Sequence, residues 1–279
     1  MKKINRANLY FLIIVAIEIL VPRYLGIFYR TIGLSDIKLI LFINHAICFI
    51  IPAVIYLIVT KSNAKETLRL NKISVKQGAL LVLIAFLSQP IMIACSTISM
   101  LFLKNNVATL FAYLHGTPYI IQILLIAVMP AMTEEITVRG VILSGYEKVS
   151  DFKAALITGI FFGIFHLDGQ QFLYAVVLGI ILAYVVRITN SLFSSMLIHF
   201  IINGTSVTLQ QVALKVNSAA LENAGNTDLT SLAVNEKIGI IFIELMVGIV
   251  FLSIVILLIK QLRKITLKQY NISGKSLGI

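Results

Sequence analysis

Two adjacent glutamates and an arginine follow directly on an apolar stretch of the chain. The stretch from Tyr119 to Pro130 has no charged residue, and Glu134, Glu135 and Arg139 come next. Neighbouring residues of a helix point about 100° apart, so the two carboxylates cannot both face the same way. Glu135 and Arg139 are four residues apart, in the order that favours an ion pair on a helix. Glu134 is therefore left as the free carboxylate, which suits a general base acting on water.

Two later stretches place further polar side chains in apolar surroundings. In FFGIFHLDG, His166 comes four residues after Phe162, and in SMLIHFIINGTS, Asn203 comes four residues after His199. Residues four apart share a helix face, so His199 and Asn203 can point into one cavity while Phe162 packs beneath His166. An ionisable side chain inside a membrane is costly and usually has a function or a partner.

These side chains would form a hydrolytic site if the fold brought them together. Glu134 would take a proton from water, and His166 would hold that water directly or through a metal. His199 and Asn203 would donate hydrogen bonds to the oxyanion that forms at a scissile carbonyl. In the metal alternative, the two histidines and a carboxylate form a zinc ligand set with a fourth position for water. The sequence leaves both versions open, so the expected cofactor is zinc or another divalent metal, or none.

The composition indicates what kind of fold must position these side chains. Of the 279 residues, 59% are hydrophobic and only 13% are charged, and the mean hydropathy is +0.97. A soluble domain carries about 25% charged residues. The chain is therefore predicted to be an all-α, polytopic transmembrane helical bundle. Cys48 and Cys95 both fall in apolar runs, which favours small buried side chains over a disulfide framework.

About eight stretches are apolar enough to cross a bilayer, although the fifth is shorter than the roughly 20 residues that a spanning helix usually needs. They are residues 8–28, 38–60, 78–103, 119–145, 152–167, 170–187, 190–208 and 237–260. We expect one integral-membrane domain over residues 1–279, in which residues 119–208 carry the catalytic motifs.

The distribution of positive charge predicts the orientation. If the N-terminus is cytoplasmic, most of the 23 lysines and arginines fall in cytoplasmic segments, as the positive-inside rule requires. Both termini are then cytoplasmic and the number of spans is even. The net charge of +11 therefore indicates topology, and the expected partners are membrane lipid and a membrane-associated substrate, without nucleic acid.

Four other ionisable residues lie in apolar stretches without a spaced partner. We expect them to make helix–helix contacts or to line a wet crevice, and we assign no chemistry to them. They are Glu18, His45, His115 and Glu244.

Three motifs, taken in order, resemble the CPBP family of intramembrane proteases. This family includes the type II CAAX prenyl endopeptidases and bacterial bacteriocin-processing and self-immunity proteins. The motifs are EEITVR (134–139), FGIFH (162–166) and HFIIN (199–203). Each motif is weak alone, but all three occur in order in the later spans, and no motif position departs from the pattern.

The resemblance implies roles for the motif residues. The residues implied to be catalytic are Glu134, His166, His199 and Asn203, and the supporting positions are Glu135, Arg139 and Phe162. Members of the family have been described both as metalloproteases and as glutamic proteases. The resemblance therefore leaves the catalytic type open, with His166 and His199 as the candidate metal ligands.

The leading hypothesis is an intramembrane endopeptidase that cleaves a membrane-associated peptide or protein. The richness in isoleucine, lysine and asparagine suggests an AT-rich bacterium, so we expect the bacterial plasma membrane and a role in peptide maturation or bacteriocin self-immunity. One alternative is a proton- or cation-coupled transporter, which predicts broken helices and repeats between halves; no repeat is evident. Another is a non-catalytic immunity or binding scaffold, which predicts a lost motif residue, whereas all are present.

Overall fold

The computed structural model describes residues 2–105, 113–114, 116–216 and 229–273, and these residues form helices and connecting turns without a strand. Within this part of the chain, seven helical stretches are long and apolar enough to cross a membrane. They are α1 (Lys3–Thr31), α2–η1–α3 (Ile37–Thr60), α5 (Val75–Met100), α7–η2–α8–η3 (Tyr119–Ile142), α10 (Gly169–Thr189), α11 (Leu192–Val216) and α13 (Val234–Ser273). The predicted all-α polytopic bundle is confirmed.

The fifth predicted span, residues 152–167, differs from the others. It corresponds to α9 (Asp151–Phe165), whose 15 residues make it shorter than the seven candidate spans. A helix of this length rises about 22 Å, less than the roughly 30 Å of a hydrocarbon core. α9 nevertheless packs inside the bundle, mainly against α10.

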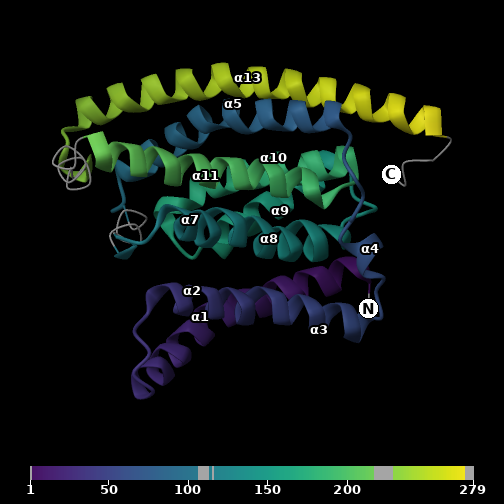
Figure 1. Cartoon of the computed structure of the whole chain (residues 1–279). Helices are drawn as coiled ribbons and strands as arrows, with labels where there is room; N and C mark the ends of the chain where they lie inside the picture. Colours follow the sequence, from purple (N-terminus) through teal and green to yellow (C-terminus); the bar gives the residue numbers. More distant parts are fainter. Residues whose placement is uncertain (1, 106–112, 115, 217–228, 274–279) are drawn as a thin grey trace.

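Successive long helical stretches alternate in direction along the bundle (Figure 1). α13 and α5 form one edge, α10 and α11 lie next to them, and α1 with α2–α3 forms the opposite edge. The start of α1 and the end of α13 lie at the same end of the bundle, as an even number of passes through it requires. Which end faces the cytoplasm stays a prediction.

Three stretches inside the spans are wound as π-helix. They are η1 (Ala46–Ile50) between α2 (Ile37–His45) and α3 (Ile51–Thr60), η2 (Ile123–Val128) between α7 (Tyr119–Gln122) and α8 (Met129–Glu135), and η3 (Ile136–Ile142) after α8. Two of them are followed by a helix with proline in its first turn, Pro52 in α3 and Pro130 in α8. Proline has no N–H to donate, and the wider π winding tolerates the missing bond. π segments are frequent at functional sites.

Glycines let α9 and α10 approach closely. A Cβ atom on Gly179 would lie 2.8 Å from the Cα of Gly159, and one on Gly163 would lie 2.4 Å from a side-chain carbon of Val176. Small residues at a membrane helix crossing permit this backbone contact. The close crossing brings the two helices that flank the site together.

Candidate active site

The predicted site residues come from three separate helical stretches that meet around one cavity. α8 carries Glu134, α9 ends beside His166, and α11 carries His199 and Asn203. The cavity has a volume of about 450 Å³, and all four residues line it together with Phe162. The fold thus brings together side chains that are up to 69 positions apart in the sequence.

Glu135 joins an arginine and a histidine beneath this cavity. Its Oε1 atom accepts a hydrogen bond from Nη1 of Arg139 at 2.9 Å and lies 2.9 Å from Nδ1 of His199. The side chains of Glu135 and Arg139 are 0% exposed. The i,i+4 pairing expected from the sequence is therefore present as a buried ion pair. Because a carboxylate oxygen accepts, Nδ1 of His199 is the protonated nitrogen and Nε2 faces away as an acceptor.

Glu134 lies on the other side of His199. Its Oε2 atom is 4.0 Å from Nε2 of His199, and its side chain is 14% exposed. This separation is too long for a direct hydrogen bond, and a water molecule can bridge two such acceptors. Adjacent glutamates therefore have different surroundings, since Glu135 is enclosed by partners while Glu134 faces the cavity.

Arg139 connects the glutamate pair to the helix crossing. Its Nη2 donates to the carbonyl oxygen of Gly179 at 3.3 Å, and its guanidinium carbon lies 4.1 Å from the ring centroid of Phe162. The cation thus stacks on an aromatic face while its Nη1 and Nη2 atoms remain paired, an arrangement available to arginine and not to lysine. The close α9–α10 crossing places both the carbonyl and the ring within its reach.

Phe162 lies between the two histidines. Its ring centroid is 4.7 Å from that of His166 and 6.0 Å from that of His199, both edge-on. Nδ1 of His166 is 2.8 Å from the carbonyl oxygen of Phe162, so Nδ1 donates and Nε2 is left as the acceptor. Phe162 thus holds His166 with both its ring and its backbone, one turn away, as the spacing predicted.

The position of His166 depends on a sharp turn. His166 is the C-terminal cap of α9, Leu167 adopts a left-handed conformation (φ 50°), and the Asp168 carboxylate accepts from the N–H of Gln170 to begin α10. The chain therefore reverses directly after the histidine. Ending α9 here leaves the imidazole at the end of a helix, against the cavity.

Asn203 is tied to the stretch that precedes the glutamates. Its Nδ2 donates to the carbonyl oxygen of Ile126 at 3.0 Å. In an α-helix this carbonyl would receive the N–H of Pro130, which proline lacks. The asparagine amide therefore satisfies a carbonyl that the proline leaves short of a donor, and it still has a second N–H.

A connecting segment outside the motifs also supports the site. Arg69, which follows α4 (Ala64–Thr67), is buried and donates to the carbonyl oxygen of Arg139 at 3.4 Å. The carbonyl of Arg69 accepts from the N–H of Leu192 at the start of α11. One residue thus links η3 to the helix that carries His199. Arg69 lies in a polar, basic stretch, and no local pattern distinguished it from a solvated charge.

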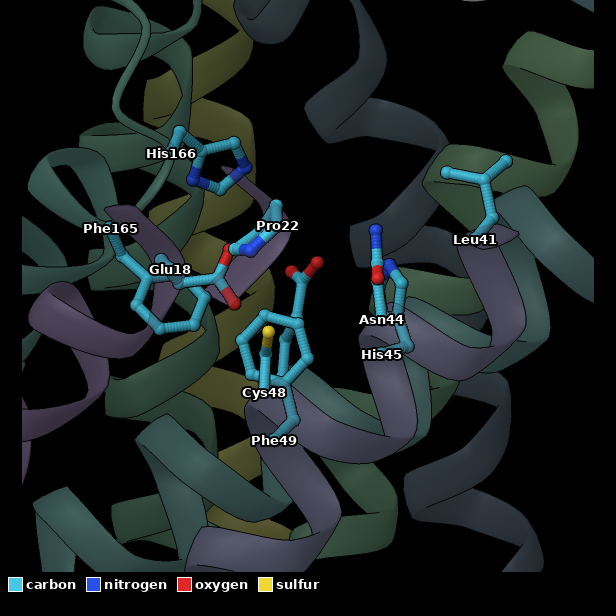
Figure 2. A pocket seen from close by; sticks show the side chains of 10 residues that line it. Glu18, Pro22, Leu41, Asn44, His45, Cys48, Phe49, Phe165 and His166 are labelled. Atoms are coloured by element: carbon cyan, nitrogen blue, oxygen red, sulfur yellow. The ribbon is translucent and has the colours of Figure 1, made fainter. Parts of the chain in front are cut away.

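Two residues to which we assigned no chemistry also lie at the site. His45 lines the main cavity and an adjoining one, and its Nδ1 is 3.1 Å from Oγ1 of Thr133. Glu18 lines the adjoining cavity (Figure 2), which Glu134 also lines. Their only sequence signal was their polarity within apolar stretches. His115 lies outside the described residues, and Glu244 on α13 lines neither cavity.

The described donor atoms do not form a complete metal site. Over the described ranges, no group of three or more histidine, cysteine, aspartate or glutamate side chains is arranged to hold a metal ion. The geometry therefore suggests no complete ligand set from such residues. Zinc or another divalent metal, with His166 and His199 as ligands, stays a prediction from the sequence.

Residues 115–205 match a protein-family model described as Rce1-like, type II CAAX prenyl endopeptidase. This segment carries the three motifs and is similar to the type II CAAX endopeptidases. The resemblance predicted from the three motifs is thereby confirmed. No curated protein and no solved structure matches the chain. With seven candidate membrane spans among its described residues, the chain has the architecture of an integral, multi-pass membrane protein.

Proposed function

We propose that the protein is an intramembrane endopeptidase in which Glu134 activates a water molecule for attack on a peptide carbonyl. The observation that carries this proposal is the 4.0 Å gap between Oε2 of Glu134 and Nε2 of His199, both at the same cavity. Two acceptors facing one another favour a molecule with two O–H donors between them, which is water.

The surrounding contacts favour Glu134 over Glu135 as the base. Oε1 of Glu135 contacts Nη1 of Arg139 and Nδ1 of His199. Protonating that carboxylate would therefore weaken two strong hydrogen bonds. Glu134 lacks such an ion pair and faces the cavity. Glu135 would instead act as a positioning residue that holds the ring of His199.

The reaction then follows from the placed atoms. As the water oxygen bonds to the carbonyl carbon, one water proton passes to Glu134. The oxyanion accepts from the second N–H of Asn203, a preorganised donor. The C–N bond then breaks, and Glu134 returns its proton to the leaving amine. His166, with Nε2 as an acceptor, helps to hold the water, as the sequence suggested. If a divalent metal binds at the histidines, it would supply Lewis-acid activation of the same water.

The cavity lining favours an apolar, membrane-associated peptide as the substrate. About half of the side chains around the polar cluster are apolar, among them Met92, Ile93, Leu125, Leu178 and Ile202. Apolar side chains that alternate with polar groups able to fix orientation are typical of ligand sites. As a biological role, we propose peptide maturation or bacteriocin self-immunity in a bacterial plasma membrane.

Cleavage by the reconstituted protein tests this proposal. Purified protein in liposomes would be offered a library of membrane-tethered peptides, and the products would be read by mass spectrometry. Replacing Glu134 by glutamine should lower the rate by about 10²–10⁴-fold, because a general base contributes roughly that factor. Glu244→Gln is the matched control, since it changes another glutamate of a membrane helix that lines neither cavity.

Further measurements on the same sample separate the alternatives. Stoichiometric metal and loss of turnover on chelation would favour the metalloprotease version. Wild-type protein that cleaves no peptide but moves protons or cations in a Glu134-dependent way would be a transporter. Cleavage that persists in both Glu134→Gln and His166→Ala would contradict the proposed mechanism.

A further inference from the structure

A second, smaller cavity adjoins the proposed catalytic group on the side of α1 and α2. It measures about 260 Å³ and is lined by Glu134 and His166 together with residues of α1, α2, η1 and α9. Its lining residues are Glu18, Pro22, Leu41, Asn44, His45, Cys48, Phe49, Glu134, Phe165 and His166, shown in Figure 2. The pockets of drug-sized ligands are about 300–1,000 Å³, so this volume suits a single side chain rather than a whole peptide.

Glu18 gives this cavity acceptors that lack strong donors. Its carboxylate points toward the middle of the lining side chains (Figure 2), and its Oε1 is buried without a hydrogen-bond partner in the described structure. The Cys48 side chain is within hydrogen-bonding reach of Glu18, but a thiol is a weak donor. Pro22, one turn further along α1, has no N–H, so the backbone carbonyl of Glu18 also loses its α-helical donor.

The charges around this cavity also favour a positively charged ligand. No lysine or arginine is among the residues that line this cavity, and Glu18 and Glu134 are close enough to interact electrostatically. Two carboxylates around a small cavity favour a cation between them, because a buried charge needs a partner. The other polar side chains that line the cavity are those of Asn44, His45, Cys48 and His166.

We infer that Glu18 and the adjoining cavity form a specificity subsite for a lysine or arginine side chain of the substrate. The inference rests on the proposed peptidase function and deepens it. The basic side chain would enter the small cavity while the peptide backbone lies in the main cavity at Glu134. Its N–H groups would bond to the carboxylate of Glu18.

Binding to a catalytically idle protein tests this subsite. The Glu134→Gln protein, in nanodiscs of zwitterionic lipid, would be titrated with acylated apolar decapeptides, each carrying either lysine or uncharged norleucine at one scanned position. Glu134→Gln also removes the second carboxylate of the cavity, so the charge of Glu18 acts alone. Peptides with lysine at one or two adjacent positions should bind roughly tenfold or more tightly than peptides with norleucine there. A charge-assisted hydrogen bond contributes a difference in affinity of about that size.

Substitutions at Glu18 decide the outcome. Added to the same background, Glu18→Gln should abolish the lysine preference, Glu18→Asp should retain part of it, and Glu244→Gln should leave it intact. A preference that survives in Glu18→Gln, or equal binding of both peptide series by the parent, would overturn the subsite. Because no turnover is needed, a wild-type protein that binds with this preference but never cleaves would refute only the peptidase function.

Discussion

Replacing Glu135 by glutamine should destabilise the protein much more than the same change at Glu134. Glu135 shares a fully buried ion pair with Arg139 and also contacts Nδ1 of His199. Removing one partner of a buried pair leaves an uncompensated charge and costs about 3–5 kcal/mol. Glu134 is part of no comparable pair, so Glu134→Gln should lower the free energy of unfolding by about 1 kcal/mol or less.

The double variant Glu135→Gln with Arg139→Met removes both charges. It therefore distinguishes the effect of losing the ion pair from the effect of leaving Arg139 buried without its partner. Removing both charged partners of a buried pair is often close to neutral, so the double variant should be more stable than Glu135→Gln alone by about 2 kcal/mol. It should also retain more peptidase activity than Glu134→Gln, because the proposed base is still present.

The stability assay can use a buried thiol, since the chain contains no tryptophan. Cys48 is 1% exposed, so its alkylation by a reagent too bulky for the 260 Å³ cavity that it lines, in a Cys95→Ser background, reports unfolding as denaturing detergent is added. Equal stability of Glu135→Gln and the parent, or a double variant weaker than the single one, would refute the reasoning about the ion pair. Activity retained in Glu134→Gln but absent from folded Glu135→Gln would exchange the two proposed roles.

Two further changes test the elements that position the site. Gly179→Ala should lower the free energy of unfolding by about 1–3 kcal/mol through overpacking and should lower activity, because the new methyl carbon would lie 2.8 Å from the Cα of Gly159. The control in the same alkylation assay is Gly78→Ala, because nothing lies within 4 Å of the methyl group added there. Ser74→Ala should lower the free energy of unfolding by about 0.5–2 kcal/mol, because Ser74 and Gln77 form the capping box of α5. Ser74→Thr should keep the cap and the stability. Equal losses of stability in both variants would show that the cap contributes nothing.

The membrane fold was readable from composition and hydropathy. Backbone groups in hydrocarbon must be paired within the segment, so long apolar stretches in a chain of this kind become helices. α1, α5 and α13 accordingly follow the stretches predicted for them. The short α9 was harder to judge, because it ends at a turn made by Leu167 and Asp168, whose conformation hydropathy does not report.

The pairing of Glu135 with Arg139 was also predictable, because residues four apart on one helix are neighbours whatever surrounds them. The same local rule related Phe162 to His166. Contacts between helices obey no such rule. That Glu135 also holds His199 depends on how α8 and α11 pack.

The sequence by itself therefore determined the fold class, the family motifs and the contacts within each helix, since all of these depend on periodicity along one segment. Only the tertiary structure decided which nitrogen of His199 faces Glu134, and that Asn203 satisfies a carbonyl left by Pro130. It also decided that Glu18, 116 residues before Glu134, lines a cavity with it. The physical reason is that helix packing sets these distances through side-chain shape and close glycine crossings, which no single segment contains.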